Sequence, residues 1–144
     1  MENFSFDFQL AFADFLRVGI AFLLAFPIGL ERGRSQRSIG LRTFPIVAIA
    51  SCGFFLIVRH APDASAETSA RVIQGIITGI GFIGGGAIIK EEGNVQGLAT
   101  AASIWNTGAI GLAVAAGREE IAVVLSLINF ILLRLLSPIA ESQS

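Results

Sequence analysis

Residues 98–116 read LATAASIWNTGAIGLAVAA and contain no charged side chain. An α-helix rises about 1.5 Å per residue, so roughly 20 such residues cross the hydrocarbon core of a bilayer. The few polar side chains in the stretch can hydrogen-bond to neighbouring helices or to their own backbone. The stretch therefore predicts a membrane-spanning helix.

Four other apolar runs accompany this stretch, at residues 10–30, 44–58, 72–89 and 121–136. Of the 144 residues, 53% are hydrophobic and only 15% are charged, and the mean hydropathy is +0.74. These values are too apolar for a soluble domain. The sequence predicts an all-α integral membrane protein, a single domain over residues 1–144 with about five transmembrane helices.

The basic residues of the short loops predict the orientation. With alternating helices, six fall on one side (Arg32, Arg34, Arg37, Arg42, Lys90 and Arg134) and three on the other (Arg59, Arg71 and Arg118). Because basic loops stay in the cytoplasm, the N-terminus is predicted outside and the C-terminus inside. Near the outer end, Arg17 follows Asp14 by one helical turn, which predicts a local ion pair, and the single histidine, His60, is expected to be solvated.

Glycines crowd the third run and suggest close helix packing. Gly75 and Gly79, and Gly81 and Gly85, are each four residues apart, a spacing that lets the backbone of a neighbouring helix approach. The fourth run offers small residues at matching spacing, namely Ser103, Thr107 and Gly111. The third helix is therefore predicted to be central and to pack face to face with the fourth.

Polar side chains gather where four segments should meet the cytoplasmic boundary. They are Glu31, Arg32, Arg42, Thr43, Asn94 and Thr100, and they predict a binding site at this face, with Arg32 as the partner of Glu31 and Arg42 as a second candidate partner. The carboxylates of Glu31, Glu91 and Glu92 are weak candidates for holding a metal ion, whose identity the sequence leaves open. The alternative is that helix ends are simply polar.

Several classes of function are disfavoured. The pattern G-x-G-x-x-G at residues 79–84 lies inside a membrane-length run and lacks the acidic partner of a dinucleotide site. No catalytic set of residues is visible, which predicts that the chain is not an enzyme and uses no cofactor. The formal net charge of −1 gives no basic footprint for nucleic acid.

Four ordered motifs carry a resemblance to a known family. They are Gly29-Leu30-Glu31-Arg32, Gly40-Leu41-Arg42-Thr43, the glycine-rich run at 79–89, and the run at 94–105 that begins Asn94-Val95-Gln96-Gly97. In this order and spacing they resemble the N-terminal membrane domain of the MgtC/SapB family. Many members continue into a soluble cytoplasmic domain, whereas this sequence stops after the fifth run, and Ala99 stands where the family pattern has threonine.

The resemblance implies a multi-pass protein of the bacterial inner membrane, with adaptation to magnesium limitation and virulence as its context. It also implies regulation of other inner-membrane proteins, the F-type ATP synthase among them, and it carries the polar site positions onto the six residues named above. Membrane lipid and a second copy of the chain are further expected partners. Two functions stay open, a non-enzymatic regulator that binds membrane proteins and a small transporter or channel for Mg²⁺ or another ion.

Overall fold

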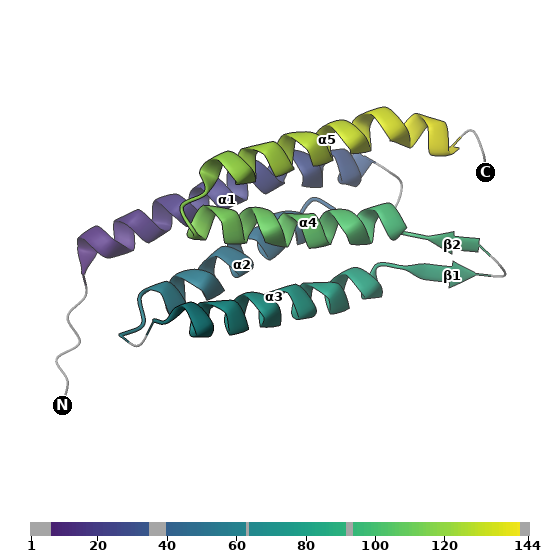
Figure 1. The fold of residues 1–144 in the computed structure, drawn as a ribbon. Coiled ribbons are helices and arrows are strands. Elements are labelled where there is room, and N and C mark those ends of the chain that lie inside the picture. The colour runs from purple at the N-terminus through teal and green to yellow at the C-terminus, as the bar shows by residue number, and fades with distance from the viewer. Residues whose placement is uncertain (1–6, 35–39, 63, 92–93, 142–144) are drawn as a thin grey trace.

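The computed structural model describes residues 7–34, 40–62, 64–91 and 94–141. Five helices follow one another along the chain: α1 (Phe8–Arg34), α2 (Thr43–Arg59), α3 (Ala66–Gly86), α4 (Leu98–Ala115) and α5 (Glu119–Glu141). Figure 1 shows them side by side in one bundle, each running opposite to the helix before it. The predicted all-α architecture of five helices is confirmed.

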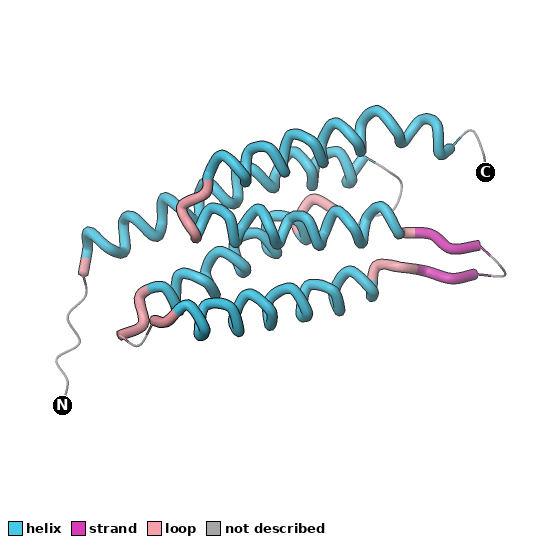
Figure 2. The backbone as a smooth tube through the Cα atoms, viewed as in Figure 1, coloured by secondary structure: helices cyan, strands magenta, loops and turns pink. Residues whose placement is uncertain are grey.

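A short β-hairpin joins α3 to α4 and was not predicted. Strands β1 (Ile89–Glu91) and β2 (Asn94–Gln96) pair antiparallel, and Figure 2 shows them extending past the helices. The predicted helix at 72–89 is therefore wrong at its end, since α3 stops at Gly86. Three consecutive glycines, Gly84–Gly86, weaken the helix there. Helix α3 also begins at Ala66, six residues before the predicted start at residue 72. Ser65 caps it there, because its hydroxyl oxygen accepts a hydrogen bond of 3.0 Å from the Thr68 backbone nitrogen.

Helix α4, rather than α3, is the central helix of the bundle. It packs against each of the other four helices, whereas the principal neighbours of α3 are α2 and α4. Buried residues follow α4 from Ser103 to its last residue, Ala115. The prediction that the glycine-rich helix is central is wrong, because α3 packs mainly against two helices and four of its glycines face away from the bundle.

The predicted glycine face of α3 points away from α4. A Cβ atom added at Gly75, Gly79, Gly81 or Gly85 would have no atom of the bundle within 4 Å. The inner face is instead Ile76, Ile80 and Gly84, and Gly84 lies close to the backbone of Ala101. The isoleucines bury more apolar surface than glycine does, so they take the inner face.

The small residues of α4 do form a buried packing surface, but Gly111 packs against α2 rather than α3. Ser103, Thr107 and Gly111 are all buried. A Cβ at Gly111 would fall within 3.0 Å of the carbonyl oxygen of Ala48, so the α2 and α4 backbones touch at this point. The end of the Ile80 side chain occupies the space above Gly108, so α3 meets α4 by placing a large side chain over a small one.

Polar side chains inside the bundle tie α5 to its neighbours. Ser126 Oγ donates to the Leu24 carbonyl of α1 at 2.6 Å, and Ser103 Oγ donates to Asn129 Oδ1 at 3.0 Å. Asn106 Nδ2 donates to the Leu125 carbonyl at 3.3 Å. Hydrogen bonds of this kind hold helices together where lipid supplies no hydrophobic force.

The outer surface of the bundle is apolar. Phe15, Ile57 and Phe82 are 71%, 70% and 86% exposed. By length and composition, α1 and α4 could each cross a membrane, and α2 is a shorter apolar helix. Large exposed apolar side chains on every side are typical of a surface that faces lipid rather than water.

Candidate functional site

The hairpin end of the bundle is the end where α1 and α3 stop, the hairpin lies, and α2 and α4 begin (Figure 1). The six predicted site residues all belong to these segments. Glu31 and Arg32 lie in the last turn of α1, Arg42 precedes α2, and Thr43 begins it. Asn94 is in β2 and Thr100 is in the first turn of α4. That these residues form a binding site stays a prediction.

The glycines of the first two motifs serve backbone packing. The chain returns from the α1–α2 loop directly against the last turns of α1. A Cβ at Gly40 would lie 2.8 Å from the Gly33 backbone nitrogen, and one at Gly29 would lie 3.1 Å from the Gly40 carbonyl oxygen. Only glycine permits so close an approach. This contact fixes where Glu31 and Arg32 emerge relative to Arg42.

Glu31 pairs with a different arginine from the one predicted. Its carboxylate lies 3.7 Å from Arg34 Nη1, one turn along α1, and its side chain is only 18% exposed. Arg32 is the next residue, so its side chain leaves the helix in another direction, and the predicted Glu31–Arg32 pair is wrong for this reason. Within the described ranges, the buried Arg32 Nε has no hydrogen-bond partner. Arg42 is exposed.

The hairpin carries the remaining site residues. Asn94 is exposed on β2 and lies opposite Glu91, and Thr100 is half-buried. Glu92, the third metal-ligand candidate, lies outside the described residues. In the part of the chain that the structure describes, no three His, Cys, Asp or Glu side chains come together as a metal site would require.

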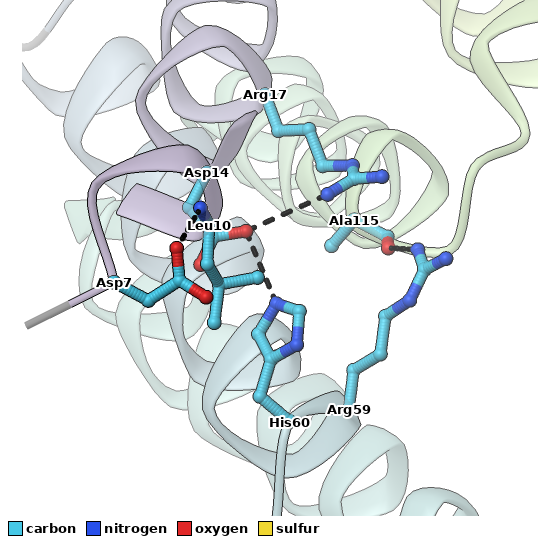
Figure 3. Close-up of polar contacts among 7 residues, drawn as sticks. All are labelled: Asp7, Leu10, Asp14, Arg17, Arg59, His60 and Ala115. Carbon is cyan, nitrogen blue, oxygen red and sulfur yellow. Dashed lines mark hydrogen bonds and ion pairs between the residues drawn. The ribbon is translucent and has the colours of Figure 1, made fainter. Parts of the chain in front are cut away.

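A second polar cluster, at the opposite end of the bundle, joins α1, α2 and α4. Asp14 Oδ1 lies 3.5 Å from Arg17 Nη1 and 3.1 Å from His60 Nε2, as Figure 3 shows. Beside it, Arg59 Nη1 donates a 2.7 Å hydrogen bond to the carbonyl of Ala115, at the last residue of α4. Asp7 closes the first turn of α1 by accepting from the backbone nitrogens of Gln9 and Leu10.

Sequence reasoning found only part of this cluster. The Asp14–Arg17 pair is confirmed, because it depends only on helical spacing. His60 is exposed, as expected, but the sequence did not predict its contact with Asp14, which lies 46 residues away along the chain. A local pattern contains no signal for such a contact, which depends on how α1 and α2 pack.

The comparison with protein families decides the identification. The MgtC family model matches residues 18–142, which include all of α2, α3 and α4 and the hairpin between them. The chain belongs to the MgtC family.

Relatives with names support the assignment and differ in length. Protein MgtC of Brucella abortus is 39% identical over 121 residues, which cover 84% of this chain and 50% of the relative. An Escherichia coli protein named "Putative magnesium transporter YhiD" is 31% identical over 128 residues, 84% of this chain and 60% of its own. An uncharacterised Synechocystis protein, slr0014, is 42% identical over 96 residues, 67% of this chain and 40% of its own.

This member of the MgtC family therefore spans about half the length of these relatives. No solved structure matches it. The matched segment contains both motifs whose glycines pack at the α1–α2 turn. The segment that the family model matches therefore includes the close backbone packing at the hairpin end. Asp14 and Arg17 precede the matched segment, whereas Arg59 and His60 lie inside it.

Proposed function

We propose that this chain is a non-enzymatic, multi-pass protein of the bacterial inner membrane that regulates other membrane proteins by binding them at its hairpin end. The observation that carries the proposal is that the ends of α1, α2, β2 and α4, whose sequences contain these polar residues, lie together at one end of an MgtC-family bundle. Adaptation to low magnesium or virulence is the proposed context, and a protein of the same membrane is the proposed partner.

The geometry of the hairpin end suits protein recognition. Arg42 and Asn94 are exposed, and the hairpin extends past the helices, where a partner can reach it. Close backbone packing at Gly29 and Gly40 holds the α1–α2 turn in one position. Exposed polar groups that are already held in one arrangement lose less conformational entropy when they bind a partner than flexible groups do.

The proposed orientation places the hairpin end in the cytoplasm, because six loop arginines and lysines fall on that side against three on the other. All five helices then cross the bilayer, with α2 sheltered by its neighbours. A cysteine at exposed Lys90, in a Cys52→Ser background, should react with a membrane-impermeant reagent only after cells are opened. Labelling in intact cells would reverse the orientation.

Magnesium transport is the second candidate, and the name of the Escherichia coli relative favours it. A hydrated Mg²⁺ ion needs carboxylate oxygens. Glu31 supplies one at the hairpin end, but Arg34 already pairs with it. Flux measurements separate the two candidates.

The test uses the purified chain in vesicles that contain a magnesium-sensitive dye, together with growth of a deletion strain in low magnesium. We expect no Mg²⁺ flux above that of empty vesicles. We also expect Glu31→Gln and Asn94→Ala each to remove the effect on growth, because each alters the proposed binding face.

The control variant is Glu67→Gln, an exposed carboxylate at the opposite end that pairs with Arg71. It should support growth as the wild type does, and immunoblots should show all variants in the membrane at equal amounts. Robust Mg²⁺ flux by the wild type, lost in Glu31→Gln, would instead establish the transporter.

A further inference from the structure

The first half of α1 is only lightly packed. Its buried residues are Ala21, Ala25, Ile28 and Gly29, all in the second half, whereas residues 8–20 are exposed or only partly buried. Figure 1 shows the start of α1 extending past the end of the bundle. We name residues 8–20 the α1 arm. Val18 of the arm packs against the buried core, but the arm as a whole buries less apolar area than the second half of α1, so polar contacts contribute more to its position.

A side-chain hydrogen bond between Asp14 and His60 joins this arm to α2. Asp14 Oδ1 and His60 Nε2 are 3.1 Å apart, and the two side chains are 28% and 30% exposed. His60 is the C-cap of α2, where its own backbone nitrogen bonds to the carbonyl of Leu56. The imidazole is therefore held at the helix end and is still reached by protons from solvent.

Several other described charged groups at this end of the bundle have hydrogen-bond or ion-pair partners. Arg17 shares the Asp14 carboxylate from within α1, and Arg59 is bonded to the Ala115 carbonyl at the end of α4. Two further ion pairs lie in neighbouring segments. Glu67 pairs with Arg71 within α3, and Arg118, which precedes α5, pairs with Glu120 in its first turn. Asp7 accepts from the backbone of α1. Asp63 lies outside the described residues.

Protonation of His60 changes what this contact can do. A neutral imidazole donates from Nε2 in only one of its two tautomers. An imidazolium donates from both nitrogens and adds a positive charge opposite the carboxylate, which makes the hydrogen bond shorter and stronger. Histidine is the side chain whose charge ordinarily changes between about pH 5 and about pH 8.

We propose that Asp14 and His60 form a pH-dependent clasp that fixes the α1 arm against the end of α2 when His60 is protonated and releases it when His60 is neutral. The bistable element is the α1 arm, and the local event is the gain of one proton at the histidine. In the proposed orientation the clasp lies at the outer face, so it responds to the pH outside the membrane.

The test measures the distance between spin labels at Phe12→Cys on the arm and Ile57→Cys on α2, two exposed positions, in a Cys52→Ser background. The full chain is placed in lipid nanodiscs at about pH 5.5 and about pH 8. We expect one narrow distance distribution at the lower pH and a broader one at the higher pH. His60→Gln retains an amide donor but cannot titrate, and Asp14→Asn removes the charge, so each should abolish the dependence on pH.

The matched control is Glu67→Gln, which removes a carboxylate from the same end without touching the clasp, and it should respond to pH as the parent does. A second measurement needs no substitution. Hydrogen–deuterium exchange of the unmodified chain, corrected for the intrinsic effect of pH, should show greater protection of the α1 arm at the lower pH. Equal distributions and equal protection at both pH values would overturn the proposal, as would a pH response that persists in His60→Gln.

Discussion

Replacing Gly111 by leucine should unfold the bundle at its centre. Gly111 lies on the buried face of α4, and a Cβ there would fall within 3.0 Å of the Ala48 carbonyl oxygen of α2. The clash is with backbone, so no side chain can move aside, and overpacking of this kind should lower the free energy of unfolding by about 3 kcal/mol or more. Titration with SDS in detergent micelles, followed by circular dichroism, measures the loss.

Gly79→Leu is the matched control, because the same substitution is made where nothing of the bundle lies within 4 Å of the new Cβ. Its stability should equal or exceed that of the wild type, since leucine favours a helix interior by roughly 1 kcal/mol over glycine. This expectation reverses the one that glycine spacing alone suggests. A loss in Gly79→Leu as large as that in Gly111→Leu would mean that the glycine face of α3 is packed, and no loss in Gly111→Leu would mean that α2 and α4 do not meet as the structure shows.

Replacing Gly97 by alanine should separate the hairpin from the start of α4. Gly97 has a φ of 89°, and a Cβ there would fall within 3.0 Å of the Ala87 carbonyl oxygen. The left-handed backbone costs an alanine about 1–2 kcal/mol, and the clash adds a similar amount. We expect a lower midpoint of unfolding and faster proteolysis at the hairpin.

Gly117→Ala tests the two contributions separately. Gly117 also has a positive φ, of 74°, but its Cβ would have only Arg59 Nη1 nearby, at 3.9 Å. It should therefore show the backbone penalty alone, about 1–2 kcal/mol. If Gly97→Ala were no worse than Gly117→Ala, the close approach of Gly97 to Ala87 would not be a stabilising constraint.

The candidate site was predictable as a set of positions but not as a set of interactions. Alternation of the helices is enough to bring Glu31, Arg42 and Asn94 to one end, because each apolar run returns the chain to the other side. The partner of Glu31 is Arg34, one turn further along the helix, which is the same spacing that joins Asp14 to Arg17. It was missed because the predicted run ends at residue 30, whereas α1 continues to Arg34.

What the sequence by itself determined is the number and order of the helices, the small-residue surface of α4 and the Asp14–Arg17 pair. Each follows from composition or from spacing within one helix, and such local preferences hold wherever the helix is placed. The four motifs likewise identified the family, because a family resemblance depends on the order and spacing of residues along the chain and not on how the helices pack.

The tertiary structure alone decided which helix is central, which face of α3 turns inward, and that His60 meets Asp14. These features depend on how much surface each face can bury against a particular neighbour, a quantity shared between segments far apart in sequence. Small residues identify a helix that can be approached closely, but only the packing of the whole bundle determines which helix approaches it.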